Sequence, residues 1–350
     1  MSMGLRVRPA MTTRTDAMTE VGTAARSDES RPLLEIKNMR ISFPVGKEVV
    51  RAVNGISLAL ETGESLGVVG ESGCGKSVTF NGVMRLLKSP PAVIEGEVFL
   101  NGRDLLKLSE KQMRKVRGKE AAMIFQEPMR SLNPVMRAGD QIIEALTWHE
   151  GMSKGKAGAR ALELFEMVEI PDAKSRLQSY PHQLSGGLRQ RVMIAMALAC
   201  NPQIMIADEP TTALDVTIQA QILDLLKRLQ NETGMSIVMI THDMGVVADI
   251  VDNVAVFYAG CVVETADKYS IFKNPMHPYT AGLLGCIPTM NTQSARLPVI
   301  EGSLPNPAQL PEGCAFSARC GFATDICREA KPALKDYGNN HSCACHHAAG

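Results

Sequence analysis

Apolar residues follow two different periods along the chain, and these periods divide it into predicted strands and helices. Residues 33–43, LLEIKNMRISF, alternate apolar with polar positions, as a half-buried strand does. A second strand pattern covers 52–60, and short apolar runs follow near 64, 120, 203, 236 and 253. Helical stretches such as TIQAQILDLLKRLQNET, residues 217–233, lie between these runs. This order of elements predicts an α/β fold.

A glycine-rich segment follows the apolar run at 64–70. It reads GESGCGKS, from Gly70 to Ser77, and fits the pattern G-x-x-x-x-G-K-[ST] between a predicted strand and a predicted helix over 76–88. Glycines let the backbone curl so that several N–H groups point at one phosphate, at the positive end of the following helix. We expect Lys76 to bridge the β- and γ-phosphates of a nucleotide and Ser77 to ligate Mg²⁺. The alternative interpretation is a glycine-rich turn with an exposed lysine.

Two adjacent carboxylates end the apolar strand pattern PQIMIADEP, residues 202–210. Acidic side chains at the end of a buried strand are unfavourable unless a cation or a ligand satisfies them. Asp208 is therefore expected to help hold Mg²⁺, and Glu209, which faces the other way, to deprotonate an attacking water. The alternative is a pair of solvated carboxylates.

A second anion-binding helix start lies between these two segments. It reads LSGGLRQR, from Leu184 to Arg191. Ser185 is predicted to cap the helix, and Gly186 and Gly187 leave the N–H groups of its first turn open to an anion. Two such helix starts in one chain make sense if two similar domains pair head to tail, each covering the nucleotide of the other.

Together these segments resemble the ATP-binding subunit of an ABC transporter, in which LSGG is the signature motif. The resemblance implies a RecA-like α/β core, a small antiparallel β portion and a helical subdomain over about 130–200. The nucleotide-binding domain would span 32–266, after a mobile tail over 1–31. NVAVFYAGCVVETA, residues 253–266, is expected to form a closing hairpin that turns at Ala259 and Gly260.

The resemblance also assigns roles to four single residues. Gln126 in MIFQEP matches the Q-loop, which reaches Mg²⁺ or the attacking water, and His242 in VMITHD matches the switch histidine that contacts the γ-phosphate. Asp215 matches the D-loop across the dimer, and Phe43 stands where the family has an aromatic ring on adenine. The candidate residues around ATP and Mg²⁺ are therefore Phe43, Gly70, Ser72, Gly73, Cys74, Gly75, Lys76, Ser77, Val78, Gln126, Ser185, Gly186, Gly187, Asp208, Glu209, Asp215 and His242.

Charge and hydropathy exclude some classes of partner. Lys plus Arg and Asp plus Glu both number 37, so no net charge draws the chain to nucleic acid or anionic lipid. The apolar run VMIAMALAC, residues 192–200, is shorter than the roughly 20 residues of a membrane helix. The N-terminal segment mixes Arg with Asp and Glu and does not resemble a secretory signal. We therefore expect the thiols to lie in a reducing cytoplasm, where clustered cysteines bind metals more often than they form disulfides.

Five of the nine cysteines lie in the last part of the chain. The segment YSIFKNPMHPYTAGLLGCIP, residues 269–288, and the later GCAFSARCGFATDIC resemble the C-terminal extension of the oligopeptide and dipeptide importer ATPases, here over 267–350. That resemblance implies a [4Fe–4S] cluster on Cys314, Cys320, Cys327 and Cys345. Cys343, in HSCACH, is the alternative fourth ligand, zinc is the alternative metal, and unligated thiols are the remaining possibility.

The resemblance implies an ATP-hydrolysing subunit that powers peptide import. It would lie at the cytoplasmic face of the cell membrane and pair with a second, homologous ATPase subunit. Two transmembrane permease subunits and, indirectly, an extracytoplasmic substrate-binding protein would complete the transporter. The alternatives are import of nickel or another small solute, and a soluble ABC ATPase acting in DNA repair or translation. The latter usually carries two cassettes or a long coiled-coil insertion, and this sequence has neither.

Overall fold

The structure is a computed structural model that describes residues 31–212, 214–287 and 299–348, apart from the side chain of Arg130. The tail expected over 1–31 lies outside the described residues except for Arg31. Pro32–Gly350 forms one unit by its internal contacts. Within the described part of the chain, no helix combines the length and the hydropathy that crossing a membrane requires.

The first strands form an antiparallel sheet, as predicted. Its order is β2 (Glu48–Leu60), β1 (Leu34–Val45), β4 (Val93–Leu100) and β5 (Arg103–Asp104). In β1 the buried positions change phase, from Leu34 and Ile36 to Met39 and Ile41, because a register shift lies between Ile36 and Met39. The bulge keeps apolar side chains on the core side on both halves of the strand.

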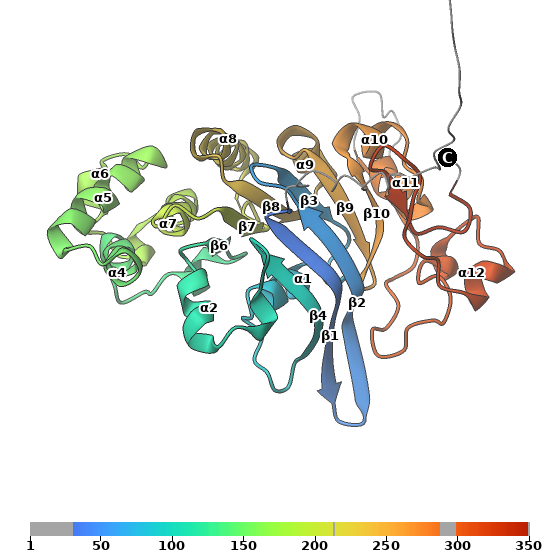
Figure 1. Ribbon diagram of the computed structural model, residues 1–350. Coiled ribbons are helices and arrows are strands. Elements are labelled where there is room, and N and C mark those ends of the chain that lie inside the picture. Colours follow the sequence, from blue (N-terminus) through green and yellow to red (C-terminus); the bar gives the residue numbers. More distant parts are fainter. Residues whose placement is uncertain (1–30, 213, 288–298, 349–350) are drawn as a thin grey trace, which may run out of the picture. The chain divides into compact units, whose positions relative to one another are not determined.

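The second sheet contains the strands predicted near 64, 120, 203, 236 and 253. It has eight strands in the order β11-β12-β10-β9-β3-β8-β7-β6 (Figure 1). Five run parallel, namely β3 (Ser65–Val69), β6 (Ala121–Ile124), β7 (Ile204–Asp208), β8 (Ser236–Thr241) and β9 (Asn253–Tyr258). Every residue of β3, β7 and β8 is buried. Strands covered on both faces explain why these runs are continuously apolar and do not alternate.

Helices pack against this sheet: α1 (Lys76–Val83), α2 (Glu110–Val116), α8 (Val216–Thr233) and α9 (Met244–Ile250). The helix predicted over 76–88 is shorter than expected and ends at Val83. Arg85 adopts a left-handed backbone conformation with φ 50°, which reverses the chain. Its guanidinium donates to the carbonyl oxygens of Leu105 and Leu108, so the reversal is held from outside the helix.

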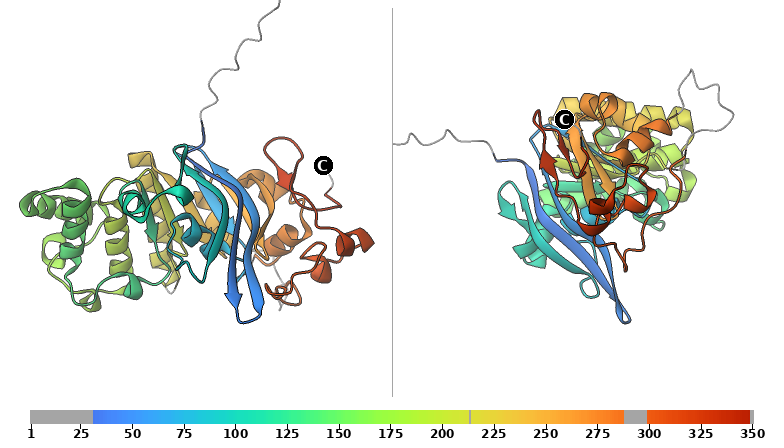
Figure 2. Two further views of the ribbon diagram at one scale, coloured as in Figure 1. Left: turned by 60° about the horizontal axis from the view of Figure 1, so that its bottom comes forward. Right: turned by 90° about the vertical axis from the view of Figure 1, so that its right-hand side faces the viewer.

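A helical group occupies the predicted range between 130 and 200. It comprises α3 (Pro128–Ser131), α4 (Ala138–Glu150), α5 (Lys154–Met167), α6 (Ala173–Arg176) and α7 (Gly186–Leu198). These helices lie beyond β6, at the opposite end of the eight-stranded sheet from the C-terminal segment, in both Figure 1 and Figure 2. Their division from the sheet as a separate subdomain stays a prediction.

The predicted hairpin at Ala259 and Gly260 is present. It joins β9 to β10 (Cys261–Asp267), and the two turn residues have φ of 47° and 76°. Positive φ at both central residues is the geometry that a tight hairpin prefers.

The C-terminal segment continues the sheet from this hairpin. It contains α10 (Lys268–Lys273), α11 (Pro278–Gly285), α12 (Asp325–Glu329), β11 (Lys335–Asp336) and β12 (Ser342–Cys343), with β12 paired to β10. Its main polar anchor is Glu264 of β10, which is fully buried. The carboxylate accepts from the backbone N–H groups of Met276 and His277, at 2.7 and 3.0 Å, and lies 2.7 Å from Nε2 of buried His341.

Replacing Glu264 by Ala should therefore loosen the whole C-terminal segment. The change leaves two backbone donors and one imidazole without an acceptor, and each such buried group costs about 1–3 kcal/mol. We expect the free energy of unfolding, measured by urea titration, to fall by about 3 kcal/mol or more. Glu232→Ala, at a half-exposed carboxylate that pairs with Arg228 along α8, is the control and should change it by less than about 0.5 kcal/mol. Equal effects of the two substitutions would contradict the anchoring role of Glu264.

Candidate functional site

The glycine-rich segment forms a tight loop between β3 and α1. Gly70, Gly73 and Gly75 have φ of 149°, 84° and 104°, which side-chain-bearing residues rarely adopt. A Cβ atom at Gly70 would lie 2.3 Å from the carbonyl oxygen of Phe257, and one at Gly75 would lie 2.5 Å from that of Ala52. The loop therefore packs its backbone directly against the neighbouring strands.

Lys76 and Ser77, the first residues of α1, point in different directions. Lys76 is buried, and its Nζ donates to the carbonyl oxygens of Gly70 at 2.6 Å and Glu71 at 3.0 Å. The Ser77 hydroxyl donates to Oδ1 of Asp208 at 2.8 Å. The loop after β3 and the end of β7 thus meet at the same edge of the sheet, as the carboxyl ends of parallel strands do.

Asp208 is buried at the end of β7. Burial raises the pKa of its carboxyl, and nearby Glu209 adds to this, whereas the Ser77 hydrogen bond and Lys76 oppose it. A buried carboxylate with a raised pKa is stabilised when a cation binds beside it. The pair Ser77 and Asp208 supplies the hard oxygen atoms that Mg²⁺ prefers, so these residues fit that ion.

Glu209 brings the next predicted residues together. Its backbone adopts φ 46°, and its carboxylate accepts from Nε2 of Gln126 at 2.8 Å and from Oγ1 of Thr212 at 2.9 Å. Nδ1 of His242 lies 3.2 Å from the other carboxylate oxygen. Burial by itself would raise the pKa of Glu209, but the bonds to Thr212 and His242 outweigh it and hold that pKa below its usual value. The carboxylate is therefore ionised at neutral pH and able to accept a proton.

Thr212 is the one member of this group that sequence reasoning missed. Its only sequence signal is a hydroxyl placed shortly after the paired carboxylates in DEPTT. Its bond to Glu209 depends on the turn at 209–212, which the backbone bond from Thr212 N–H to the Glu209 carbonyl closes at 3.1 Å.

Other predicted residues lie outside the group around Glu209, and two of them cap helices. Phe43 is half-buried on β1, opposite Val50 of β2, and packs against the core of the antiparallel sheet. Ser185 caps α7, as predicted, by accepting from the N–H of Leu188 at 3.3 Å. Asp215 caps α8 by accepting from the N–H of Ile218 at 3.0 Å. Ser185 and Gly186 are exposed, so the start of α7 is open to another molecule.

The remaining loop residues differ in exposure. Ser72 is exposed, and Val78 is half-buried against the core that underlies α1. Cys74 is buried, and burial raises the pKa of its thiol. A thiol with a raised pKa is a weak nucleophile, so the structure favours a packing role for this side chain.

The cysteines of the C-terminal segment gather in one region. Burial raises the pKa of the Cys314 thiol, and Cys327, Cys345 and Cys320 raise it further. Cys343 is fully buried in β12, and its pKa is raised first by burial and then by Glu264. Over the described ranges, no three His, Cys, Asp or Glu side chains are arranged to hold a single metal ion.

Comparison with known proteins agrees with this geometry. The family profile described as "ABC transporter" matches residues 53–212, and that described as "Oligopeptide/dipeptide transporter, C-terminal region" matches 263–327. The oligopeptide transport ATP-binding protein OppD of Bacillus subtilis is 51% identical over 311 residues, 88% of this chain and 87% of that protein. The dipeptide transport ATP-binding protein DppD of the same organism is 48% identical over 314 residues, 89% of this chain and 94% of that protein.

A solved structure gives the same fold. The ATP-binding cassette MJ0796, determined as a dimer in a post-hydrolysis state with ADP and Pi, is 32% identical and superposes with a TM-score of 0.61. The match covers 67% of this chain and 98% of that one. The α/β core, the loop after β3 and the matches on both parts of the chain agree, and the chain belongs to the ATP-binding subunits of oligopeptide- and dipeptide-type ABC transporters.

Proposed function

We propose that this ABC ATPase powers the import of di- or oligopeptides. The observation that carries the ATPase part is the group at the sheet edge, where the buried Lys76, the pair Ser77–Asp208 and the ionised Glu209 lie together. The peptide part rests on the relatives OppD and DppD, which are named for oligopeptide and dipeptide transport.

Each residue of the group has one chemical task in this proposal. Lys76 leaves the carbonyl oxygens of the loop and pairs with the β- and γ-phosphates of ATP. Ser77 and Asp208 hold Mg²⁺, which when bound neutralises phosphate charge. Glu209 accepts the proton of the attacking water, while Gln126 and His242 orient that water and contact the γ-phosphate. Thr212 holds the Glu209 carboxylate in place through its hydroxyl.

The chain would work as one half of an ATPase pair. Ser185, Gly186 and Gly187 open the exposed N-terminus of α7, and they would bind the γ-phosphate held by the partner subunit. The dimeric state of MJ0796 supports this arrangement. Asp215 would lie at the same dimer contact, and Phe43 would stack on the adenine. ATP binding then closes the dimer, and hydrolysis reopens it.

Two permease subunits at the membrane would receive this motion through the neighbourhood of Gln126, and an extracytoplasmic binding protein would deliver the peptide. The chain would then lie at the cytoplasmic face of the membrane.

ATP-dependent uptake of a labelled peptide by vesicles that contain the assembled transporter tests the function. Uptake of nickel or another small solute but of no peptide would replace the substrate class and leave the ATPase assignment intact.

We further propose that Cys314, Cys320, Cys327 and Cys345 bind a [4Fe–4S] cluster. The proposal rests on the resemblance of the segments that contain these residues to the C-terminal extension of the oligopeptide and dipeptide importer ATPases, whose family profile matches residues 263–327. Cys343 is fully buried in β12, opposite Glu264 of β10, which favours the more exposed Cys345 as the fourth ligand.

Glu209→Gln should keep ATP binding and slow hydrolysis. An amide cannot accept the proton from water, and a positioned base contributes about 10²–10⁴ in rate. Turnover of the assembled transporter and ATP affinity are both measured. Glu163→Gln, at an exposed carboxylate of α5, should change neither, and Lys76→Ala should weaken ATP binding itself. Turnover of Glu209→Gln within a few-fold of wild type would refute the base assignment.

Ser185→Arg should impair hydrolysis of the nucleotide held by the partner subunit, and not of the nucleotide bound at Lys76 of its own chain, while the isolated chain binds ATP normally. The bulky cation would occupy the place of the γ-phosphate of the partner's nucleotide, far from the loop of its own chain. Ser175→Arg, at an exposed serine of α6, is the matched control and should have no effect. If a rigorously monomeric preparation hydrolyses ATP at the full rate, the shared site is wrong.

Protein purified without oxygen should be brown and contain about four iron atoms per chain. Cys345→Ser should remove most of the iron, whereas Cys343→Ser and Cys200→Ser should retain it, because Cys343 lies in β12 and Cys200 follows α7. Iron lost only with Cys343→Ser would reverse the assignment of the fourth ligand. Zinc in place of iron would reject the cluster.

A further inference from the structure

Two segments of the C-terminal extension, distant in sequence from the phosphate loop, each form a hydrogen bond with the same loop residue, Glu71. The backbone N–H of Glu71 donates to Oη of Tyr279, 208 positions later, at 2.9 Å. Its carboxylate accepts from Nη1 of Arg319, 248 positions later, at 3.0 Å. Glu71 is the first residue after Gly70, so both contacts act on the turn that opens the loop.

Arg319 is held rigidly at this contact. Its side chain is only 6% exposed, against 28% for Glu71. Its Nε donates to the carbonyl oxygen of Glu301 at 2.9 Å and its Nη2 to that of Ile300 at 3.0 Å. The guanidinium also lies over the rings of Tyr258 and Phe316, at 5.8 and 5.9 Å from their centroids. A guanidinium with so many partners has little freedom to leave Glu71.

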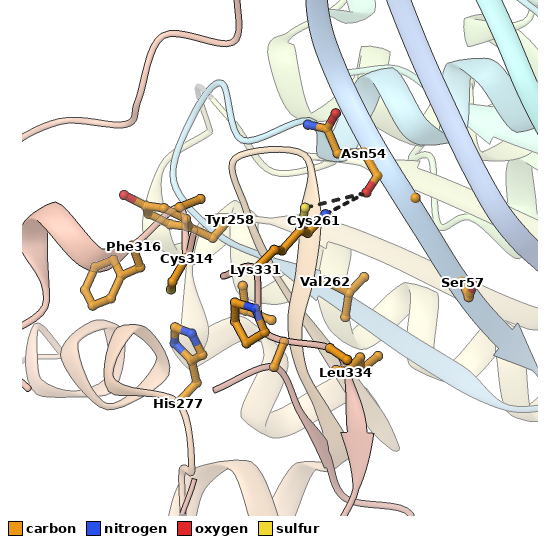
Figure 3. Close-up of a pocket in the computed structure, with 16 residues that line it drawn as sticks. Asn54, Ser57, Tyr258, Cys261, Val262, His277, Cys314, Phe316, Lys331 and Leu334 are labelled. Carbon is orange, nitrogen blue, oxygen red and sulfur yellow. Dashed lines mark hydrogen bonds between the residues drawn. The ribbon is translucent and has the colours of Figure 1, made fainter. Parts of the chain in front are cut away.

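Tyr279 is equally fixed. It is fully buried, and its ring packs against Tyr258 and Phe316 with centroid distances of 4.6 and 5.4 Å. His277 caps α11 and accepts from the N–H of Tyr279 at 3.0 Å, which sets the start of the helix. Figure 3 shows Tyr258, Phe316 and His277 on one side of a cavity of about 520 Å³ between β2, β10 and the extension. The aromatic cluster thus forms the base from which Tyr279 and Arg319 reach the loop.

The contacts at Glu71 also restrict the rest of the phosphate loop. Its carbonyl oxygen accepts from the backbone N–H of Cys74 at 3.3 Å, which closes a turn within the loop. The rest of the loop is rich in glycine, which loses more conformational entropy on ordering than any other residue. A loop that is ordered before the nucleotide arrives binds it more tightly, because less entropy remains to be lost.

We infer that Tyr279 and Arg319 are positioning residues that hold the phosphate loop in its ATP-binding conformation. The affinity for ATP then depends on the C-terminal extension, although neither side chain touches the reacting atoms. The inference rests on the proposed function, because it requires ATP to bind at this loop. An effect on loop order alone weakens binding of ATP in its ground state and its transition state alike, so KM and Kd rise while kcat stays nearly unchanged.

The test uses the full chain and the assembled transporter. Tyr279→Phe removes one oxygen and keeps the ring packing, and Arg319→Met keeps much of the side-chain volume and removes the charge. We expect the Kd for ATP, measured by titration calorimetry, to rise about threefold for Tyr279→Phe and about tenfold for Arg319→Met. KM should rise in parallel, with kcat within about twofold of wild type. Arg319→Lys should fall between wild type and Arg319→Met, because lysine restores the charge but not the planar fork.

Arg328→Met is the matched control. Arg328 belongs to the same extension, has a side chain that is 61% exposed, and pairs with the nearby Asp325. The Kd of the Arg328→Met variant for ATP should therefore equal that of wild type. Glu71→Gln combined with Arg319→Met should raise Kd by less than the product of the two single effects, because both variants remove the same ion pair. Circular dichroism and iron content, which Tyr279→Phe should leave unchanged, separate loop positioning from a general loss of the extension.

The outcomes distinguish the two proposals. If wild type does not bind ATP, the proposed function itself fails. If wild type binds ATP and both Tyr279→Phe and Arg319→Met bind it equally well, the positioning role is refuted and the proposed function survives. A fall in kcat with unchanged KM and Kd would also refute it, because that pattern belongs to a group that acts only in the transition state.

Discussion

The close packing of the loop backbone between β3 and α1 is the constraint on which the rest of the site depends. Gly70 and Gly75 bring main-chain atoms into contact with the carbonyl oxygens of Phe257 and Ala52, where a side chain would collide. This packing buries Lys76 inside the loop and turns Ser77 toward Asp208. The geometry of the site is therefore set by close contact between backbone segments. The positions of the side chains that carry the chemistry follow from this contact.

The parallel sheet supplies the second half of this arrangement. The strands β3, β7 and β8 are neighbours, and β6 flanks β7, so the residues that follow their carboxyl ends meet at one edge. Gln126, Glu209 and His242 are distant in sequence yet form one hydrogen-bonded group there. Glu209 has its pKa lowered and Asp208 has its pKa raised, although the two are adjacent. The difference arises because burial prevails at Asp208, whereas at Glu209 the hydrogen bonds to Thr212 and His242 together outweigh burial.

Among the polar contacts that join the C-terminal extension to the core, two groups centre on a carboxylate residue. Glu264 of β10 anchors it by accepting from Met276, His277 and His341, and Glu71 of the loop receives Tyr279 and Arg319. The segments HPYT and FSARC therefore supply structural contacts, in addition to the cysteine that FSARC contains. His277, Tyr279, Phe316 and Arg319 build a packed wall behind the phosphate loop, so the extension and the nucleotide-binding residues share one structural unit.

The sequence by itself determined the strands, the loop and the association of Ser77 with Asp208 at the end of a distant strand. These features depend on local pattern: apolar runs, glycines at a turn and carboxylates after a strand. The same local reasoning placed the hairpin turn at Ala259 and Gly260 and the cap at Ser185. Local reasoning overestimated the length of α1. The helix ends early because Arg85 adopts a left-handed conformation, which carbonyl oxygens from another segment stabilise.

Only the tertiary structure decided which distant residues share a hydrogen bond. Thr212 joins Glu209 through a turn whose closure no sequence pattern specifies, and Tyr279 and Arg319 meet Glu71 across more than 200 positions. Such contacts depend on how β10 and the aromatic cluster orient the extension against the loop. Because that orientation comes from packing between segments distant in the chain, the local order of residues could not reveal it.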